Sequence, residues 1–111
     1  MTSTTTGTAA IIRISGEIDL ATAEAAAAAL VRAAATLPPP RIFVLDLTDV
    51  GFLSVAGARM VHRFASGCAD RGLDVRLVAD PNSIVPRIFR YLLVDVRRGI
   101  FDSVEQALLD S

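Results

Sequence analysis

Several kinds of residue are rare or missing in this 111-residue chain, and each absence excludes a class of function. Lysine is missing altogether, so all eleven basic residues are arginines, and twelve acidic residues offset them. The isoelectric point is about 5.7, whereas nucleic-acid-binding domains usually exceed about 9. A nucleic-acid partner is therefore not expected.

Cysteine and histidine occur once each, as Cys68 and His62. One thiol cannot form an intramolecular disulfide, and one cysteine with one histidine is too few for a zinc site, so no metal is expected. Cys68 is predicted to be a small buried hydrophobic residue, and the alternative is a redox-sensing thiol. His62 falls in an apolar helical pattern with no evident nucleophile beside it, which favours a structural role over a Ser–His–Asp triad.

Phosphate-binding loops and long apolar runs are also missing. Gly51 and Gly57 lie six residues apart with no lysine after them, so they do not form a P-loop. We therefore expect no cofactor and no enzymatic activity. The alanine-rich segment is uncharged only between Glu24 and Arg32, far less than the roughly 20 residues that span a bilayer. Residues 1–8 lack the pattern of a secretory signal, so we expect a cytoplasmic protein without membrane insertion.

The sequence does contain alternating strand and helix patterns, enough for one domain. Residues 1–8 are predicted to be a flexible tail or a short edge strand, and residues 9–111 to be the folded domain. Strands are expected at 9–15, 42–47, 75–79 and 96–101, and helices at 22–36, 55–71, 83–92 and 102–109. This order predicts an α/β fold with a mostly parallel or mixed sheet of four or five strands and about four helices.

The junction between the second strand and the second helix is the most informative stretch. Residues 48–53 are predicted to connect the two, and a turn of small residues at 54–57 begins the helix. Open α/β sheets bind ligands and partners at the carboxyl ends of their strands. Free N–H groups in the 54–57 turn would favour an anion such as a nucleotide phosphate. Because only eight residues precede Ala9, the edge of the 9–15 strand is expected to be unpaired and to favour a homodimer.

Three stretches together resemble the STAS domain family, whose members include bacterial anti-sigma factor antagonists. Residues 15–19 read SGEID and match the family's strand-ending S/T-G-E-L/I-D. Residues 44–53, VLDLTDVGFL, resemble its central strand and following loop, and residues 85–89, VPRIF, resemble the start of its third helix. With the matching order of elements, the resemblance covers about residues 9–110.

The resemblance implies a STAS-like single domain that binds an anti-sigma factor, often a serine kinase, and so frees a sigma factor. In the family, the kinase phosphorylates a Ser or Thr in a D-S-x-G-type loop, and the complex dissociates. A phosphoryl group adds a charge of about −1.5 to −2 at the interface, which opposes packing there. The alternative implied by other members is a nucleotide-binding module, or a scaffold subunit of a transporter or signalling complex.

The chain departs from the family pattern at the phosphorylation loop. Aligning Gly57 with the loop glycine puts Ser54 at the family's aspartate, Val55 at the phosphoacceptor and Ala56 after it. Valine cannot accept a phosphoryl group, so regulation at that position is not expected. Ser54 is predicted to cap the helix, and the alternative is a phosphoacceptor displaced by one residue. Asp19 matches a family aspartate near this loop and is also a candidate helix cap. The resemblance thus implies a partner-binding site made by Asp19 and residues 54–57.

Overall fold

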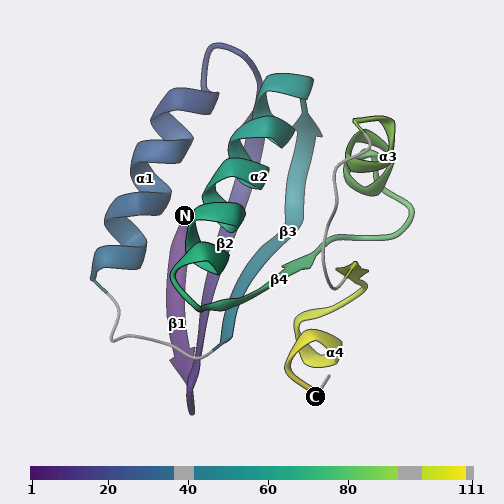
Figure 1. Cartoon of the computed structure of the whole chain (residues 1–111). Helices are drawn as coiled ribbons and strands as arrows, with labels where there is room; N and C mark the ends of the chain where they lie inside the picture. Colours follow the sequence, from purple (N-terminus) through teal and green to yellow (C-terminus); the bar gives the residue numbers. More distant parts are fainter. Residues whose placement is uncertain (37–41, 93–98, 110–111) are drawn as a thin grey trace.

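The computed structural model describes residues 1–36, 42–92 and 99–109 of the chain (Figure 1). These residues form a single α/β domain with one five-stranded sheet in the order β1-β2-β3-β4-β5. Strand β1 pairs with β2 in antiparallel fashion, and all the other neighbours are parallel, so the predicted mixed sheet is confirmed. The strands are β1 (Thr2–Thr6), β2 (Ala9–Ile18), β3 (Ile42–Leu53), β4 (Asp74–Val78) and β5 (Ile100–Phe101).

The helices divide between the two faces of the sheet. They are α1 (Ala23–Ala35), α2 (Val55–Asp70), α3 (Ile84–Tyr91) and α4 (Val104–Leu109). Alternate side chains of a strand point to opposite faces, and in β3 Phe43 and Leu45 enter the larger core beneath α1, α2 and α3. Val44, between them, packs with Ala107 of α4 in a smaller second core. In Figure 1, α1 and α2 lie side by side along the sheet.

Strand β3 is longer than the sequence predicted. The strand was expected to end at residue 47, with residues 48–53 as a connection, but it continues to Leu53. The prediction was wrong because a regular strand has apolar residues at every second position. Here the apolar positions Leu47, Val50 and Leu53 are three residues apart. All three are nevertheless buried, because the pairing between β2 and β3 contains register shifts.

Of the two expectations for residues 1–8, the structure has the short edge strand, β1, and it pairs with the edge of the 9–15 strand. Threonine is a good strand former, and Thr2–Thr6 pairs with β2 from Thr2↔Arg13 to Thr6↔Ala9. The link between the strands is a two-residue loop in which Gly7 has a φ of 58°. Glycine tolerates that left-handed conformation, and it commonly begins tight hairpin turns. One edge of the sheet is therefore β1, and every residue of β1 is exposed.

The helices start and stop close to the predicted residues, but not every apolar residue in them is buried. Leu30 of α1 is buried, but Val31, one residue on, is 59% exposed because successive residues are about 100° apart around a helix. Val55 is likewise exposed, at the first residue of α2. Cys68 is buried in the last turns of α2, as predicted.

Serine side chains cap the last two helices. The Ser83 hydroxyl accepts the N–H of Val85 at 3.3 Å, which is the predicted start of α3. The Ser103 hydroxyl accepts the N–H of Gln106 at 3.1 Å, whereas the Gln106 side chain accepts the N–H of Asp102 and not that of Ser103. The expected strand at 96–101 is described only from residue 99 onward, and β5 accounts for its end. Leu37 and the three prolines after it lie outside the described residues.

Candidate functional site

The turn at residues 54–57 joins β3 to α2 and holds α2 against the end of β2. The Ser54 side-chain oxygen accepts the N–H of Gly57 at 3.0 Å, so Ser54 is the predicted helix cap. The N–H of Ser54 donates to the backbone oxygen of Ile18 at 2.9 Å. The first turn of α2 is thus tied to β2 as well as to β3.

Gly57 is needed where α2 crosses the end of β2. Any β-carbon at this position would lie 2.7 Å from the backbone oxygen of Ile18 and 3.0 Å from Cδ1 of Leu53. Contacts below 3.0 Å essentially never occur for a real β-carbon. The family glycine is therefore explained here by close packing of the helix on the sheet. The N–H of Gly57 already donates to Ser54, which leaves it unavailable for an anion.

Asp19 organises the turn that follows β2. Its carboxylate accepts the N–H of Thr22 at 2.9 Å and the Thr22 hydroxyl at 3.0 Å, and the Thr22 oxygen accepts the N–H of Asp19. The hydrogen bond from the Thr22 backbone, more than any other contact, holds the pKa of Asp19 below its usual value. Helix α1 begins after Thr22, whose side chain makes no cap bond to the helix. Asp19 therefore stabilises the turn before α1 and is not the cap of its first turn.

Asp19 and the 54–57 turn come together at one edge of the sheet. Ile18 and Leu53 are paired residues of neighbouring parallel strands, and Asp19 and Ser54 are the residues that follow them. Ser54 and Ala56 are half-buried, Val55 is exposed and Gly57 is buried. The structure thus groups all five residues that the resemblance implied.

Two further residues at this edge were not found from the sequence. Leu20 is 81% exposed, and Phe52 is 44% exposed, although both are large and apolar. Val55, within the 54–57 turn, is 36% exposed. We call Leu20, Phe52 and Val55 the apolar rim. A leucine in an otherwise polar turn was a usable signal for Leu20, whereas the exposure of Phe52 depends on the strand pairing and has no signal in the sequence.

The described residues offer little to hold a metal or a substrate. Among them, no three His, Cys, Asp or Glu side chains lie close enough together to bind a metal ion. His62 is half-buried on α2, and its Nε2 lies 3.4 Å from the Ser66 hydroxyl, one helical turn on. No helix in the described ranges has both the length and the apolar character to cross a membrane. What the edge does present is exposed apolar side chains on a rigid turn, an arrangement suited to contact with another protein.

The comparisons with known proteins agree with this architecture. The chain is similar to an anti-sigma factor antagonist from Mycobacterium paratuberculosis, with 22% identity and a TM-score of 0.74 over 96% of this chain and 88% of that one. It is similar to the STAS domain of a SulP transporter from Vibrio cholerae, with 23% identity and a TM-score of 0.64 over 95% and 81% of the two chains. It also matches SLC26A9 with 17% identity and a TM-score of 0.74, where 92% of this chain covers 19% of that one.

At these identities, the solved structures show a shared fold. A search among curated proteins found no match. The sequence profile of the STAS domain, in contrast, matches residues 1–107, which is nearly the whole chain. The chain therefore belongs to the STAS domain family.

Proposed function

We propose that this chain is a non-enzymatic regulator that binds an anti-sigma factor of the serine kinase-like type and thereby frees a sigma factor. The observation that carries the proposal is the apolar rim, which lies at the family's partner-binding turn and is exposed in the free chain. The similarity to the Mycobacterium anti-sigma factor antagonist over most of both chains supports the choice of partner.

The composition of this edge favours a protein over a small anion. An apolar side chain of the size of Leu or Phe contributes roughly 1.5–3 kcal/mol when a partner buries it fully. Interfaces commonly depend on a few such anchors placed near their centre. Two of the four backbone N–H groups of the turn are already engaged, because the N–H of Ser54 donates to Ile18 and that of Gly57 donates to Ser54, so fewer remain for a phosphate. A nucleotide is therefore the less suitable ligand for this turn.

We further propose that phosphorylation does not control docking at the family's usual position. Val55 occupies that position, at the first residue of α2, and has no hydroxyl group. The neighbouring hydroxyl of Ser54 is half-buried and is engaged in the helix cap. The partner would then be regulated by the amount of this chain and not by its modification.

A second candidate is a scaffold domain within a transporter or signalling complex. The observation in its favour is that SLC26A9 and the STAS domain of the SulP transporter share the fold. In that case the apolar rim would contact a subunit of the complex.

Affinity capture from the host lysate tests the proposal, with the full chain as bait and recovered proteins identified by mass spectrometry. The matched baits carry Phe52→Asp, in the apolar rim, and Val31→Asp, at an exposed apolar residue on α1. We expect an anti-sigma factor to be recovered by the parent and by Val31→Asp but not by Phe52→Asp. Recovery of transporter subunits would favour the second candidate, and recovery of no anti-sigma factor would overturn the first.

The regulatory part of the proposal needs its own measurement. The recovered bait is mapped for phosphorylation, and the parent and Val55→Ser are each incubated with the captured anti-sigma factor and ATP. We expect the parent to remain unmodified and Val55→Ser to accept phosphate, because only the variant presents a hydroxyl at the family position. Phosphate on Ser54 of the parent would contradict the proposal and would place the switch one residue earlier.

A further inference from the structure

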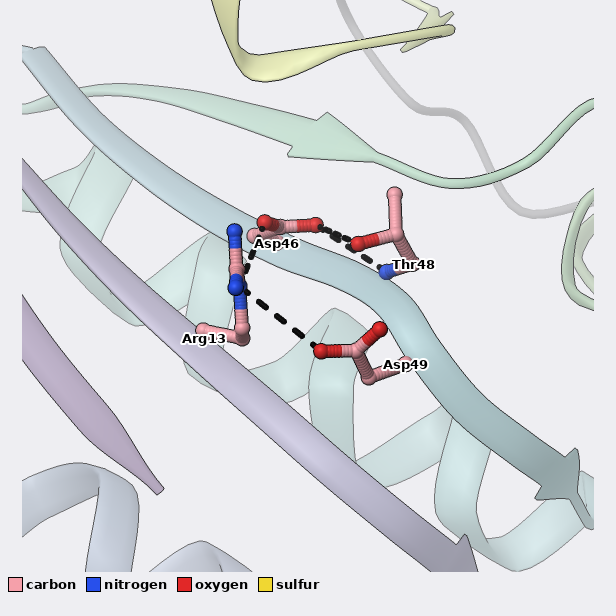
Figure 2. Close-up of polar contacts among 4 residues, drawn as sticks. All are labelled: Arg13, Asp46, Thr48 and Asp49. Atoms are coloured by element: carbon pink, nitrogen blue, oxygen red, sulfur yellow. Dashed lines mark hydrogen bonds and ion pairs between the residues drawn. The ribbon is translucent and has the colours of Figure 1, made fainter.

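A buried carboxylate in the middle of β3 is not explained by the partner-binding turn. Asp46 is only 1% exposed, and burying an ionised carboxyl group is costly unless it is paired and hydrogen-bonded. One of its oxygens, Oδ2, accepts the Nε–H of Arg13 of β2 at 3.1 Å. The other, Oδ1, accepts both the backbone N–H of Thr48 at 3.0 Å and the Thr48 hydroxyl at 2.7 Å. Figure 2 shows Arg13 reaching from β2 toward Asp46 on β3, with dashed lines from Arg13 to Asp46 and to Asp49.

These contacts lie where the pairing of β2 with β3 first becomes irregular. Arg13 pairs with Asp46 and Ser15 pairs with Asp49, so the pairing advances two residues on β2 and three on β3. The extra residue makes a β-bulge at residues 47–48, beside which the ribbon of β3 bends (Figure 2). A second bulge follows, because Gly16 pairs with Val50 but Glu17 pairs with Phe52.

The two bulges decide which side chains face the core. In a regular strand the side chains alternate, and a shift by one residue moves every later side chain to the opposite face. The first bulge puts Val50 in the core and leaves Asp49 exposed. The second buries Leu53 and leaves Phe52 exposed. If one bulge were lost, Phe52 and Leu53 would exchange faces, and the apolar rim would lose its aromatic residue.

Asp46 provides a hydrogen-bond partner for a backbone group of the first bulge. The extra residue of a bulge is left without a partner on the neighbouring strand. Here the N–H of Thr48, inside the bulge, donates to Asp46 on its own strand. The bond from Arg13 ties the same carboxylate to β2, opposite the residue where the shift begins. The buried Asp46 carboxylate thus stabilises the first bulge and also fixes where along β3 the bulge forms.

We propose that Asp46 is a positioning residue for the partner-binding site, because its carboxylate fixes the first bulge of β3 and so keeps Phe52 on the surface. The role of Phe52 in docking rests on the function proposed above. The structural step, from Asp46 to the exposure of Phe52, is independent of any partner and is tested without one.

The chain contains no tryptophan, so Phe52→Trp introduces a single fluorescent reporter at the apolar rim. Acrylamide quenching and the emission maximum of the full chain then report whether position 52 is exposed. With Asp46 intact, we expect the emission and strong quenching of an exposed indole. Adding Asp46→Leu should shift the emission to shorter wavelength and reduce the quenching about twofold or more, because position 52 turns inward.

Two further variants separate positioning from a general loss of stability. Asp46→Asn keeps an oxygen that can accept the Thr48 N–H, so the quenching should stay close to that of the intact chain. Asp49→Leu removes the neighbouring exposed carboxylate, whose Oδ2 lies 3.9 Å from Nε of Arg13, and should leave the quenching unchanged. Circular dichroism confirms that each variant is folded under the conditions of the quenching measurement.

Unchanged quenching in folded Asp46→Leu would overturn the inference, as would an equal effect of Asp49→Leu. If Asp46→Leu does not fold, hydrogen exchange of the Thr48 amide in the unaltered chain decides. Slow exchange is expected of an N–H bonded to a buried carboxylate, and exchange as fast as in an open loop would refute the bulge contact. Failure of the capture experiment with Phe52→Asp would contradict the docking proposal alone, so the two failures are distinguishable.

Discussion

Replacing Gly57 with alanine tests whether α2 approaches the end of β2 as closely as the structure shows. A β-carbon at Gly57 would lie 2.7 Å from the backbone oxygen of Ile18 and 2.8 Å from its Cγ2. The oxygen is part of the main chain and accepts the N–H of Ser54, so it cannot turn aside as a flexible side chain could. Relief of the clash therefore requires the first turn of α2 to move away from β2.

The expected loss of stability follows from three contributions. Overpacking of a well-filled contact costs about 1–3 kcal/mol, and weakening the bond from Ser54 to Ile18 costs about 1 kcal/mol. The higher helix propensity of alanine offsets about 1 kcal/mol of this loss. The free energy of unfolding should thus fall by about 1–3 kcal/mol, and the Tm should fall by about 4 °C for each kcal/mol.

The matched control is Gly67→Ala in the same helix. No heavy atom lies within 4 Å of a β-carbon at Gly67, so this change should raise stability by up to about 1 kcal/mol. Urea unfolding followed by far-UV circular dichroism compares both variants with the parent. If Gly57→Ala is as stable as Gly67→Ala, the close approach of α2 to β2 is refuted.

The remaining predictions concern single groups. Ser54→Ala should lower the free energy of unfolding by about 1 kcal/mol, because the N–H of Gly57 loses its cap, and Ser54→Asp should restore it in urea titrations. Leu30→Ala should cost about 2–5 kcal/mol because Leu30 is fully buried. The same change at the exposed Val31 should alter stability by less than about 0.5 kcal/mol in the same assay. The lowered pKa of Asp19 means that its contribution is complete above the unfolded value of 3.8 and is lost as the pH falls through the folded pKa. The difference in urea midpoint between the parent and Asp19→Asn should therefore shrink as the pH is lowered from neutral to below the folded pKa of Asp19. A difference that does not change with pH would contradict the stabilising role of the Asp19 carboxylate.

Local signals in the sequence were sufficient for the helices and for most of the sheet. Runs of β-branched residues located the cores of β2, β3 and β4, and Ser54 and Ser83 marked the starts of their helices correctly. Each signal depends only on residues that are close together in the sequence, so it could be interpreted without knowing the fold.

Features that depend on pairing between distant residues could not be predicted in this way. The two bulges of β3 exist only because β2 lies beside it. Because of them, residues 48–53 do not show the alternation of apolar and polar residues that is typical of a strand. The same bulges expose Phe52, so Phe52 was missed although Val55, another residue of the apolar rim, was named. The partnership of Arg13 with Asp46 joins residues 33 apart in the sequence, and neither residue alone signals it.

Binding of the captured anti-sigma factor to Val55→Glu tests the central claim most directly. A carboxylate at the first residue of α2 should stabilise the helix by about 0.3–1 kcal/mol, so any loss of binding is not a loss of folding. The matched control is Val31→Glu, at an exposed residue of α1. By calorimetry, we expect Val55→Glu to weaken binding at least about tenfold, or 1.4 kcal/mol, and Val31→Glu to leave it unchanged. Equal affinity of the parent and Val55→Glu would contradict docking through this turn.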